Sequence, residues 1–149
     1  MLNFYQLFVE KMQHYFTPLL LLFTRLWVAN VFLKSGYLKI TTWDSTLYLF
    51  EEEYQVPFIP WQWAAYLGTA AELILPIFLI LGLLTRPMAA VLFVFNIMAV
   101  ISYPALWEGG FYDHQLWGLM ILINIVWGAG QISMDQLLKK RLFFNHKIS

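Results

Sequence analysis

The stretch Pro87–Trp107, PMAAVLFVFNIMAVISYPALW, holds 21 residues and no charged side chain. A helix needs about 20 apolar residues to cross the ~30 Å hydrocarbon core of a bilayer. A second uncharged run, Gln115–Met134, has 20 residues. Neither run alternates polar with apolar residues, as the strands of a membrane barrel do. The two runs therefore predict two transmembrane helices.

Two more apolar stretches are each interrupted by a charged residue. In the first, Met12–Leu33, this residue is Arg25, and in the second it is Glu72. Only helices and closed barrels satisfy their backbone hydrogen bonds in lipid, so we interpret both stretches as helices. We expect an all-α integral membrane protein, a bundle of four transmembrane helices with spans at about Pro18–Gly36, Trp61–Leu84, Pro87–Tyr103 and Gln115–Gly130.

The composition agrees with a chain whose main partner is the lipid bilayer. Of its 149 residues, 60% are apolar and 12% are charged, whereas an average soluble domain has about 25% charged residues. Nine basic residues balance nine acidic ones, so we expect no nucleic-acid partner. The absence of cysteine excludes disulfides and thiol catalysis within the chain. No repeat or change of composition divides the sequence, and we expect one membrane domain over residues 1–149.

The distribution of lysine and arginine predicts the orientation in the membrane. One side receives both tails and the second loop, and it holds six of these residues: Lys11, Arg86, Lys139, Lys140, Arg141 and Lys147. The other side holds Lys34 and Lys39. The positive-inside rule therefore places the N and C termini in the cytoplasm. On the outer side, the segment Asp44–Tyr54 is apolar in its middle, and we expect a short helix there.

Each predicted span carries one strongly polar residue at or near its middle: Arg25, Glu72, Asn96 and Asn124. A central arginine costs roughly 2.5–3.5 kcal/mol on insertion scales. Because the first two spans run antiparallel, we expect Arg25 and Glu72 to lie at similar depth and to pair. The pair is either a functional site, for a ligand headgroup, a proton relay or a gate, or a clamp that only holds two helices in register.

These four residues are the candidate ligand-binding residues. No catalytic residue is assigned, and Glu72 and Arg25 are the only candidates for one. Asn96 could contact a ligand or another helix, whereas for Asn124 we favour an interhelical hydrogen bond. We expect no metal, because His114 has neither a cysteine nor a second histidine near it in the sequence.

Several strings of the sequence, in order and at matching spacing, resemble those of the DoxX-like family of membrane proteins. The first helix contributes RL at Arg25 and FLKSGYLK over Phe32–Lys39, and the second contributes Gly68, Glu72-Leu73 and LGLLTR over Leu81–Arg86. The closing segment contributes GAG over Gly128–Gly130 and SMD over Ser133–Asp135. Together these strings extend over nearly the whole chain.

The resemblance implies a multi-pass four-helix bundle in the bacterial cytoplasmic, or inner, membrane. The family is similar to the small subunit of thiosulfate:quinone oxidoreductase, and its members are linked to redox or stress-defence partners. We therefore expect a quinone-linked membrane subunit, at most an accessory subunit of an oxidoreductase, with a soluble or membrane redox partner or a homo-oligomeric assembly. In that hypothesis, Arg25 donates a hydrogen bond to a quinone, Glu72 exchanges its proton, and Asn96 completes the pocket.

Two alternatives remain open. The first is a non-catalytic anchor or assembly factor that recruits a soluble partner through the basic tail Lys139–Lys147, as in family members that accompany metal-handling peptide systems. The second is a small transporter. The sequence favours the transporter least, because no pair of broken helices in inverted halves is evident.

Overall fold

The computed structural model describes residues 2–145, and it is helical with no strand in that range. The helices are, in order, α1 (Leu2–Thr41), α2 (Trp43–Glu52), α3 (Trp61–Leu81), α4 (Thr85–Ser102), α5 (Leu106–Gly109), α6 (Phe111–Trp127) and α7 (Met134–Asn145). The four predicted spans fall on α1, α3, α4 and α6. The short helix expected over Asp44–Tyr54 is confirmed as α2.

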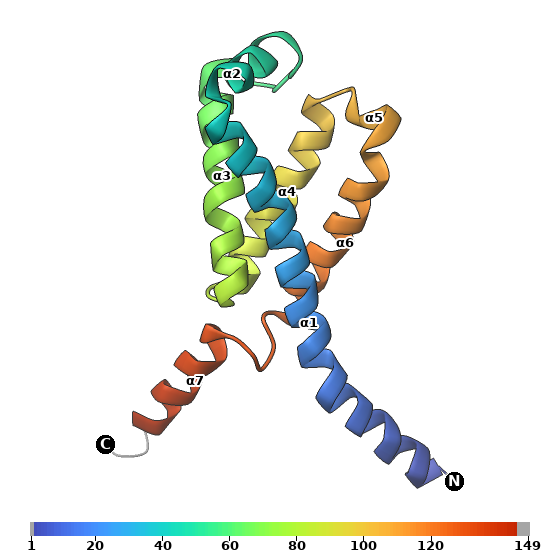
Figure 1. Cartoon of the computed structure of the whole chain (residues 1–149). Helices are drawn as coiled ribbons and strands as arrows, with labels where there is room; N and C mark the ends of the chain where they lie inside the picture. The colour runs from blue at the N-terminus through green and yellow to red at the C-terminus, as the bar shows by residue number, and fades with distance from the viewer. Residues whose placement is uncertain (1, 146–149) are drawn as a thin grey trace.

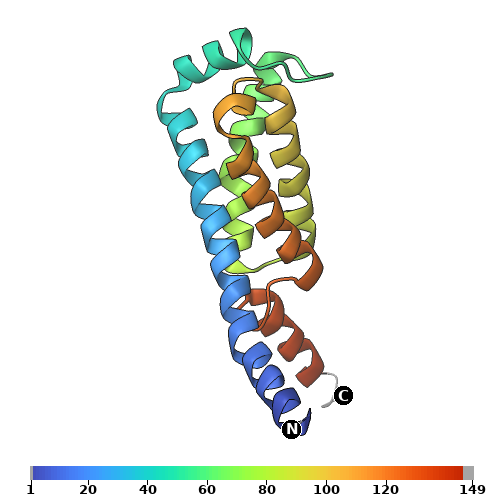
Figure 2. The same ribbon diagram turned by 90° about the vertical axis from the view of Figure 1, so that its right-hand side faces the viewer.

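The four long helices lie side by side (Figures 1 and 2). Helix α1 packs against α3 and α6, and α4 packs against the same two helices. Each helix buries side chains in a shared core, which contains Val28, Phe32, Leu79, Leu92 and Ile121. Helix α2 lies across one end of the bundle, whereas α7 and the N-terminal half of α1 diverge from the other end (Figure 1).

Within the described part of the chain, three helices are long and apolar enough to cross a membrane: Phe4–Thr41, Trp61–Leu81 and Thr85–Ser102. Helix α6 is equally apolar in character but has 17 residues. Large apolar side chains cover the exterior of the bundle, with Leu67, Val94 and Leu119 each more than half exposed. Such a surface would be unfavourable in water and is suited to lipid. The chain is therefore a membrane protein.

The first helix is longer than predicted at both ends. It has 40 residues and includes Pro18, where we expected the span to begin, and Gly36, where we expected it to end. Gly36 lies inside the helix and does not end it. Its lack of a side chain lets α3 pack closely, since a Cβ at Gly36 would lie 3.0 Å from the Cβ of Glu72. The extra turn beyond Gly36 keeps Lys39 on the helix.

The connection from α3 to α4 is a tight turn. Gly82 ends α3 in the left-handed conformation, with φ at 62°, and its N–H donates to Leu79 O. The N–H of Leu83 donates to Phe78 O, which gives the paired hydrogen bonds of a Schellman motif. Helix α3 therefore ends three residues before the predicted limit at Leu84.

Candidate functional site

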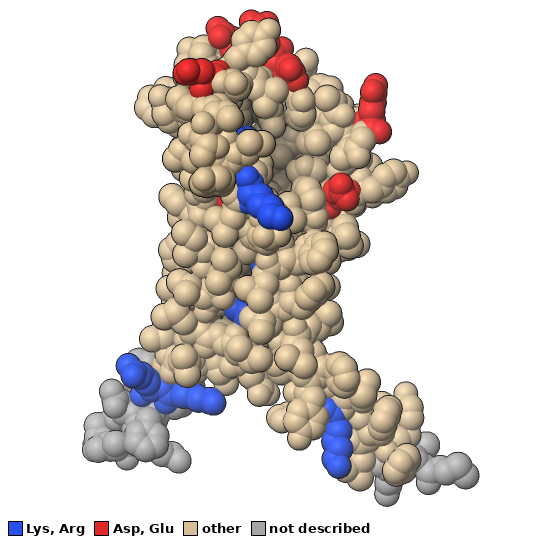
Figure 3. Space-filling view, in the orientation of Figure 1, with Lys and Arg blue, Asp and Glu red and all other residues tan. Residues whose placement is uncertain are grey.

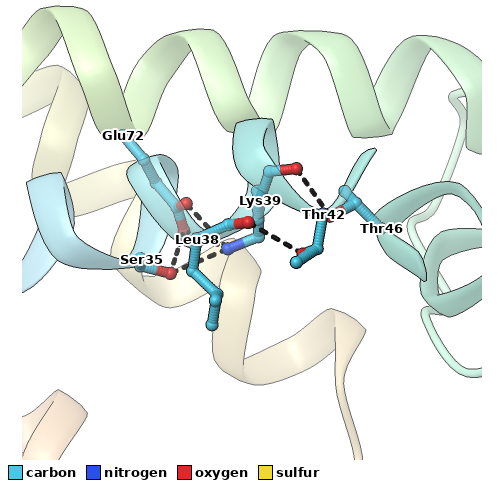
Figure 4. Close-up of polar contacts among 6 residues, drawn as sticks. All are labelled: Ser35, Leu38, Lys39, Thr42, Thr46 and Glu72. Carbon is cyan, nitrogen blue, oxygen red and sulfur yellow. Dashed lines mark hydrogen bonds and ion pairs between the residues drawn. The ribbon is translucent and has the colours of Figure 1, made fainter. Parts of the chain in front are cut away.

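Lys39 and Glu72 form the one ion pair found within residues 2–145 (Figure 4). The Lys39 Nζ donates to Glu72 Oε2 at 2.7 Å, to Oε1 at 2.8 Å and to Ser35 Oγ at 2.8 Å. The Ser35 hydroxyl in turn donates to Glu72 Oε1 at 3.2 Å. The two charged side chains are only 12% and 8% exposed. Every ammonium proton therefore has an acceptor in a site with little access to water.

The helical sequence explains how these groups meet. Ser35 and Lys39 are four residues apart, so they project from the same face of α1. Gly36, between them, allows α3 to approach closely enough for the carboxylate of Glu72 to reach both. Next to the pair, the Thr46 hydroxyl donates to Lys39 O at 2.9 Å, which ties α2 to the end of α1. The pair is thus fixed by three helices.

A cavity of about 320 Å³ lies beside this pair. Lys39 and Glu72 line it together with mostly apolar residues of α2, α3, α4 and the segment 53–60. Phe50, Tyr54 and Phe95 supply aromatic walls, and Gly68 on α3 leaves room where a side chain would project. An apolar chamber with a few polar groups at one wall is the usual form of a small-molecule site.

Stacked aromatic rings hold the segment 53–60 over this cavity. Phe50 stacks on Tyr54 with ring centroids 4.3 Å apart, and Tyr54 stacks on Tyr103 at 4.6 Å. The Tyr103 hydroxyl donates to Glu53 Oε2 at 2.9 Å. Burial, and after it the negative charge of Glu72, raises the pKa of Tyr54 above its usual range. The Tyr54 phenol therefore keeps its proton to a higher pH than an ordinary tyrosine and can act as a hydrogen-bond donor.

Arg25 does not pair with Glu72, and the expected pair is wrong. Its guanidinium is fully buried and donates to three backbone carbonyls: Ile132 O at 2.6 Å, Leu79 O at 3.3 Å and Leu21 O at 3.3 Å. The reason is helix register. Glu72 faces Gly36, whereas Arg25 lies level with Leu79, seven residues along α3, which corresponds to about 10 Å of helix.

Arg25 instead holds together the end of the bundle that lies near α7. We call this contact the Arg25 clasp, formed by Arg25, Gly82, Ile132 and Asp135. A Cβ at Gly82 would collide with the guanidinium. The Asp135 N–H donates to Gly82 O at 2.9 Å, and its carboxylate accepts from the first amides of α4. The clamp that we considered for Arg25 is therefore formed, but with the segment before α7 rather than with Glu72.

Asn96 forms a separate contact between α4 and α6. Its side-chain amide donates to His114 O at 3.0 Å, and its Oδ1 lies 2.8 Å from His114 Nδ1. Both residues line a different cavity, of about 540 Å³, which Glu72 does not line. The expectation that Asn96 completes a pocket with Arg25 and Glu72 is therefore wrong, because the three side chains lie in three distinct contacts.

Asn124 makes the interhelical hydrogen bond that we favoured for it. Its Nδ2 donates to Thr24 Oγ1 on α1 at 3.0 Å and to Met120 O at 2.7 Å. The Oδ1 atom is buried without a hydrogen-bond partner among the residues described. A direct role of Asn124, or of the other candidates, in binding a ligand stays a prediction.

Sequence reasoning missed Lys39 and Ser35 as partners of Glu72. The signal was present in the four-residue spacing of Ser35 and Lys39, and in the lack of a proline after Gly36. Taking Gly36 as the end of the span placed Lys39 in a loop. Over the part of the chain that the structure describes, no cluster of three or more metal-binding side chains occurs.

Comparison with known proteins adds a family match. The family model described as DoxX matches residues 20–105, a region that includes both Lys39 and Glu72. A relative from Haemophilus influenzae, described as an uncharacterized protein, is 32% identical over 139 residues, covering 87% of this chain and 90% of the relative. No solved structure matches the chain.

Proposed function

The chain belongs to the DoxX family, and from this premise we propose that it is a membrane subunit of a quinone-linked redox or stress-defence system. Its ligand site, in this proposal, is the cavity beside Lys39 and Glu72. The observation that carries the proposal is a buried ion pair on the wall of an otherwise apolar cavity of about 320 Å³. A volume near 300 Å³ is at the small end of the usual range for ligand sites.

The chemistry of the cavity fits the needs of a quinone headgroup. Such a ring requires hydrogen-bond donors for its carbonyl oxygens, apolar walls for its faces and a proton source on reduction. The Tyr54 phenol can donate, the Lys39 ammonium can exchange the Ser35 hydroxyl for a ligand oxygen as acceptor, and the Phe50 and Phe95 rings can pack against the headgroup. Lys39 donates to the Glu72 carboxylate through hydrogen bonds of 2.7 and 2.8 Å, and in this proposal the pair passes a proton to a bound ligand.

Within this proposal the protein is an accessory subunit. A quinone, when bound, would supply the two-electron chemistry, and this chain's residues would orient it, exclude water and hold a proton at Lys39 or Glu72. The chain has no cysteine, so a thiol donor of electrons would belong to a soluble or membrane partner. A second copy of the chain is another possible neighbour in the membrane.

The membrane arrangement is also part of the proposal. We infer that α1, α3, α4 and α6 all cross the bacterial inner membrane, that both termini are cytoplasmic, and that residues 1–149 form one domain. Two observations support this. Acidic side chains gather at the end with α2 and α5, and basic ones at the end with both termini (Figure 3). Helix α6 is covered with exposed apolar side chains, such as Leu119 and Val126.

A cavity-filling variant tests the ligand site. Ala99 lines the cavity, and Ala99→Leu adds apolar volume to it without touching the charged pair. Val126→Leu adds volume at a position that is 53% exposed, and it serves as the control. We expect a short-chain ubiquinone to bind the purified wild type and the control saturably, and to bind Ala99→Leu about tenfold more weakly. Equal affinity of the quinone for all three proteins would show that this cavity is not the ligand site.

One observation favours a second function, that of an anchor for a soluble partner. The Arg25 clasp fixes the segment before α7, and α7 then projects away from the bundle (Figure 1). It carries the exposed basic residues Lys139, Lys140 and Arg141. In this alternative, which includes a role beside metal-handling peptide systems, Lys39 and Glu72 only hold two helices together. Recovery of the same soluble protein with wild type, but not with a chain that ends at Met134, would support it.

A further inference from the structure

A third, more polar cavity is lined by the start of α4, the end of α6 and α7. It has a volume of about 480 Å³, and its walls include Arg86, Trp127, Gly128, Gln136 and Lys139. Arg86 comes from the start of α4, Trp127 ends α6, and Lys139 lies on α7. The site is at the end of the bundle opposite the Lys39–Glu72 pair, and it plays no part in the proposal for a quinone.

The guanidinium of Arg86 is exposed at this cavity and is tied to the end of α6 by one hydrogen bond. Its Nη2 donates to Val126 O at 3.1 Å. Gly128 lies against the side chain, with φ at 75°, and a Cβ there would come within 3.4 Å of Arg86 Nε. Because a positive φ favours glycine, this position both shapes the turn and makes room for the arginine. With one hydrogen bond to the protein, most of its five N–H donors remain available.

The charge at this cavity is not neutralised by the residues around it. Asp135 is the one acidic residue in its wall, but its two oxygens accept from Leu84 N–H at 2.8 Å and Thr85 N–H at 3.0 Å. Neither Arg86 nor Lys139 forms an ion pair with any residue in the range 2–145. The wall of this cavity therefore holds a guanidinium, an ammonium and one carboxylate that is engaged by backbone amides, and its net charge is positive.

We infer that this cavity binds the phosphate group of an anionic phospholipid. Arginine presents N–H groups at the spacing of phosphate oxygens, and lysine adds a second point charge. The rim favours a lipid over a free ion, because Trp127 is 61% exposed and Leu138 is 46% exposed beside the basic groups. Tryptophan is typical of the membrane interface. From there, the acyl chains can follow the exposed apolar side chains of α6, such as Val126.

Native mass spectrometry with defined lipids tests this inference. The full-length protein in detergent is titrated with dioleoylphosphatidylglycerol and, separately, with dioleoylphosphatidylcholine. The variants are Arg86→Gln and Lys139→Gln, and the control is Lys34→Gln, which removes an exposed charge that lines neither cavity. We expect each test variant to bind phosphatidylglycerol about fivefold more weakly than wild type, as loss of one basic contact near a membrane predicts. The control should bind phosphatidylglycerol with the affinity of wild type. Phosphatidylcholine should bind wild type, the control and both test variants with equal affinity.

Two results would overturn the inference. The first is equal affinity for phosphatidylglycerol in wild type, Arg86→Gln and Lys139→Gln, with circular dichroism showing that all three are folded. The second concerns the source of the phosphate. If inorganic phosphate alone raises the melting temperature of wild type but not of Arg86→Gln, and phosphatidylglycerol binds no more tightly than phosphatidylcholine, the ligand is a free anion and not a lipid.

Discussion

Gly36 on α1 faces Glu72 on α3 so closely that a Cβ on the glycine would lie 3.0 Å from the Cβ of the glutamate. This contact brings the two helices together at the level of the ion pair. It also fixes the register of α1 against α3, since the carboxylate then meets Lys39, three residues further along α1, and not Arg25. The position of one missing side chain thus decides which basic residue Glu72 can pair with.

Substitution at Gly36 should loosen this contact. We expect Gly36→Ala to lower the free energy of unfolding by about 1–3 kcal/mol, because the added methyl group overpacks a tight interface. Gly109→Ala is the matched control, as a Cβ at Gly109 would meet nothing within 4 Å. Thermal unfolding in detergent, followed by circular dichroism, measures both. Equal melting temperatures for Gly36→Ala and the control would contradict the close approach.

The Lys39–Glu72 pair should show strong coupling in a double-mutant cycle. Removing one partner leaves a buried charge without its counter-charge, so Lys39→Met or Glu72→Met alone should cost about 3 kcal/mol. The double variant, with both residues replaced by methionine, should recover most of this loss, since no buried charge remains. Unfolding in denaturant gives the four free energies. Additive losses would mean that the two side chains do not interact.

The Arg25 clasp makes a prediction about the segment before α7. The three N–H contacts of Arg25 come from three different nitrogens, and the single Nζ of a lysine cannot lie within reach of all three carbonyl oxygens, so Arg25→Lys should free the connection that contains Ile132. We expect faster hydrogen exchange over residues 130–136, including the Asp135 N–H that donates to Gly82 O. Lys34→Arg, at an exposed lysine of α1 outside this segment, is the control. Unchanged exchange in Arg25→Lys would show that the clasp does not hold this segment.

The raised pKa of Tyr54 makes a prediction about the ionisation of tyrosines at alkaline pH. Because its pKa is raised, Tyr54 keeps its proton to a higher pH than an ordinary tyrosine, so just above about pH 10 Tyr54→Phe should leave the tyrosinate absorbance unchanged. A fall by the share of one tyrosine in eight would contradict this. In the unfolded chain a tyrosine loses its proton near pH 10. The folded state therefore loses stability above about pH 10, and Tyr54→Phe should reduce that loss.

Much of the fold follows from the sequence because lipid restricts the choice of structure. Long uncharged runs without strand-like alternation predict helices, which is why α4 and α6 were predicted at nearly their observed places. The same argument extended to α3 in spite of Glu72, and the apolar middle of Asp44–Tyr54 predicted the short α2. The ends were less predictable. Gly36 resembles a helix end in sequence, and only its contact with Glu72 shows that it serves packing.

The partners of the polar residues could not be predicted from their depth alone. Arg25 and Glu72 were assigned similar depths from the limits of their spans, but a shift of seven residues along α3 separates them. Glu72 was correctly singled out as a buried charge that needs a partner, and the wrong residue was chosen for it. The partner of Asn124 was easier to predict, because an asparagine inside an apolar helix finds few hydrogen-bond partners other than those on a neighbouring helix.

The most direct test of the central claim uses the charge-free double variant Lys39→Met with Glu72→Met, provided that it melts close to wild type. The measurement is the dissociation constant of a short-chain ubiquinone in lipid nanodiscs. If the pair forms a ligand site, the loss of its charge-assisted hydrogen bonds should weaken binding about tenfold or more. If the folded double variant binds the quinone as tightly as wild type does, the pair is only a clamp between α1 and α3, and the proposed site is wrong.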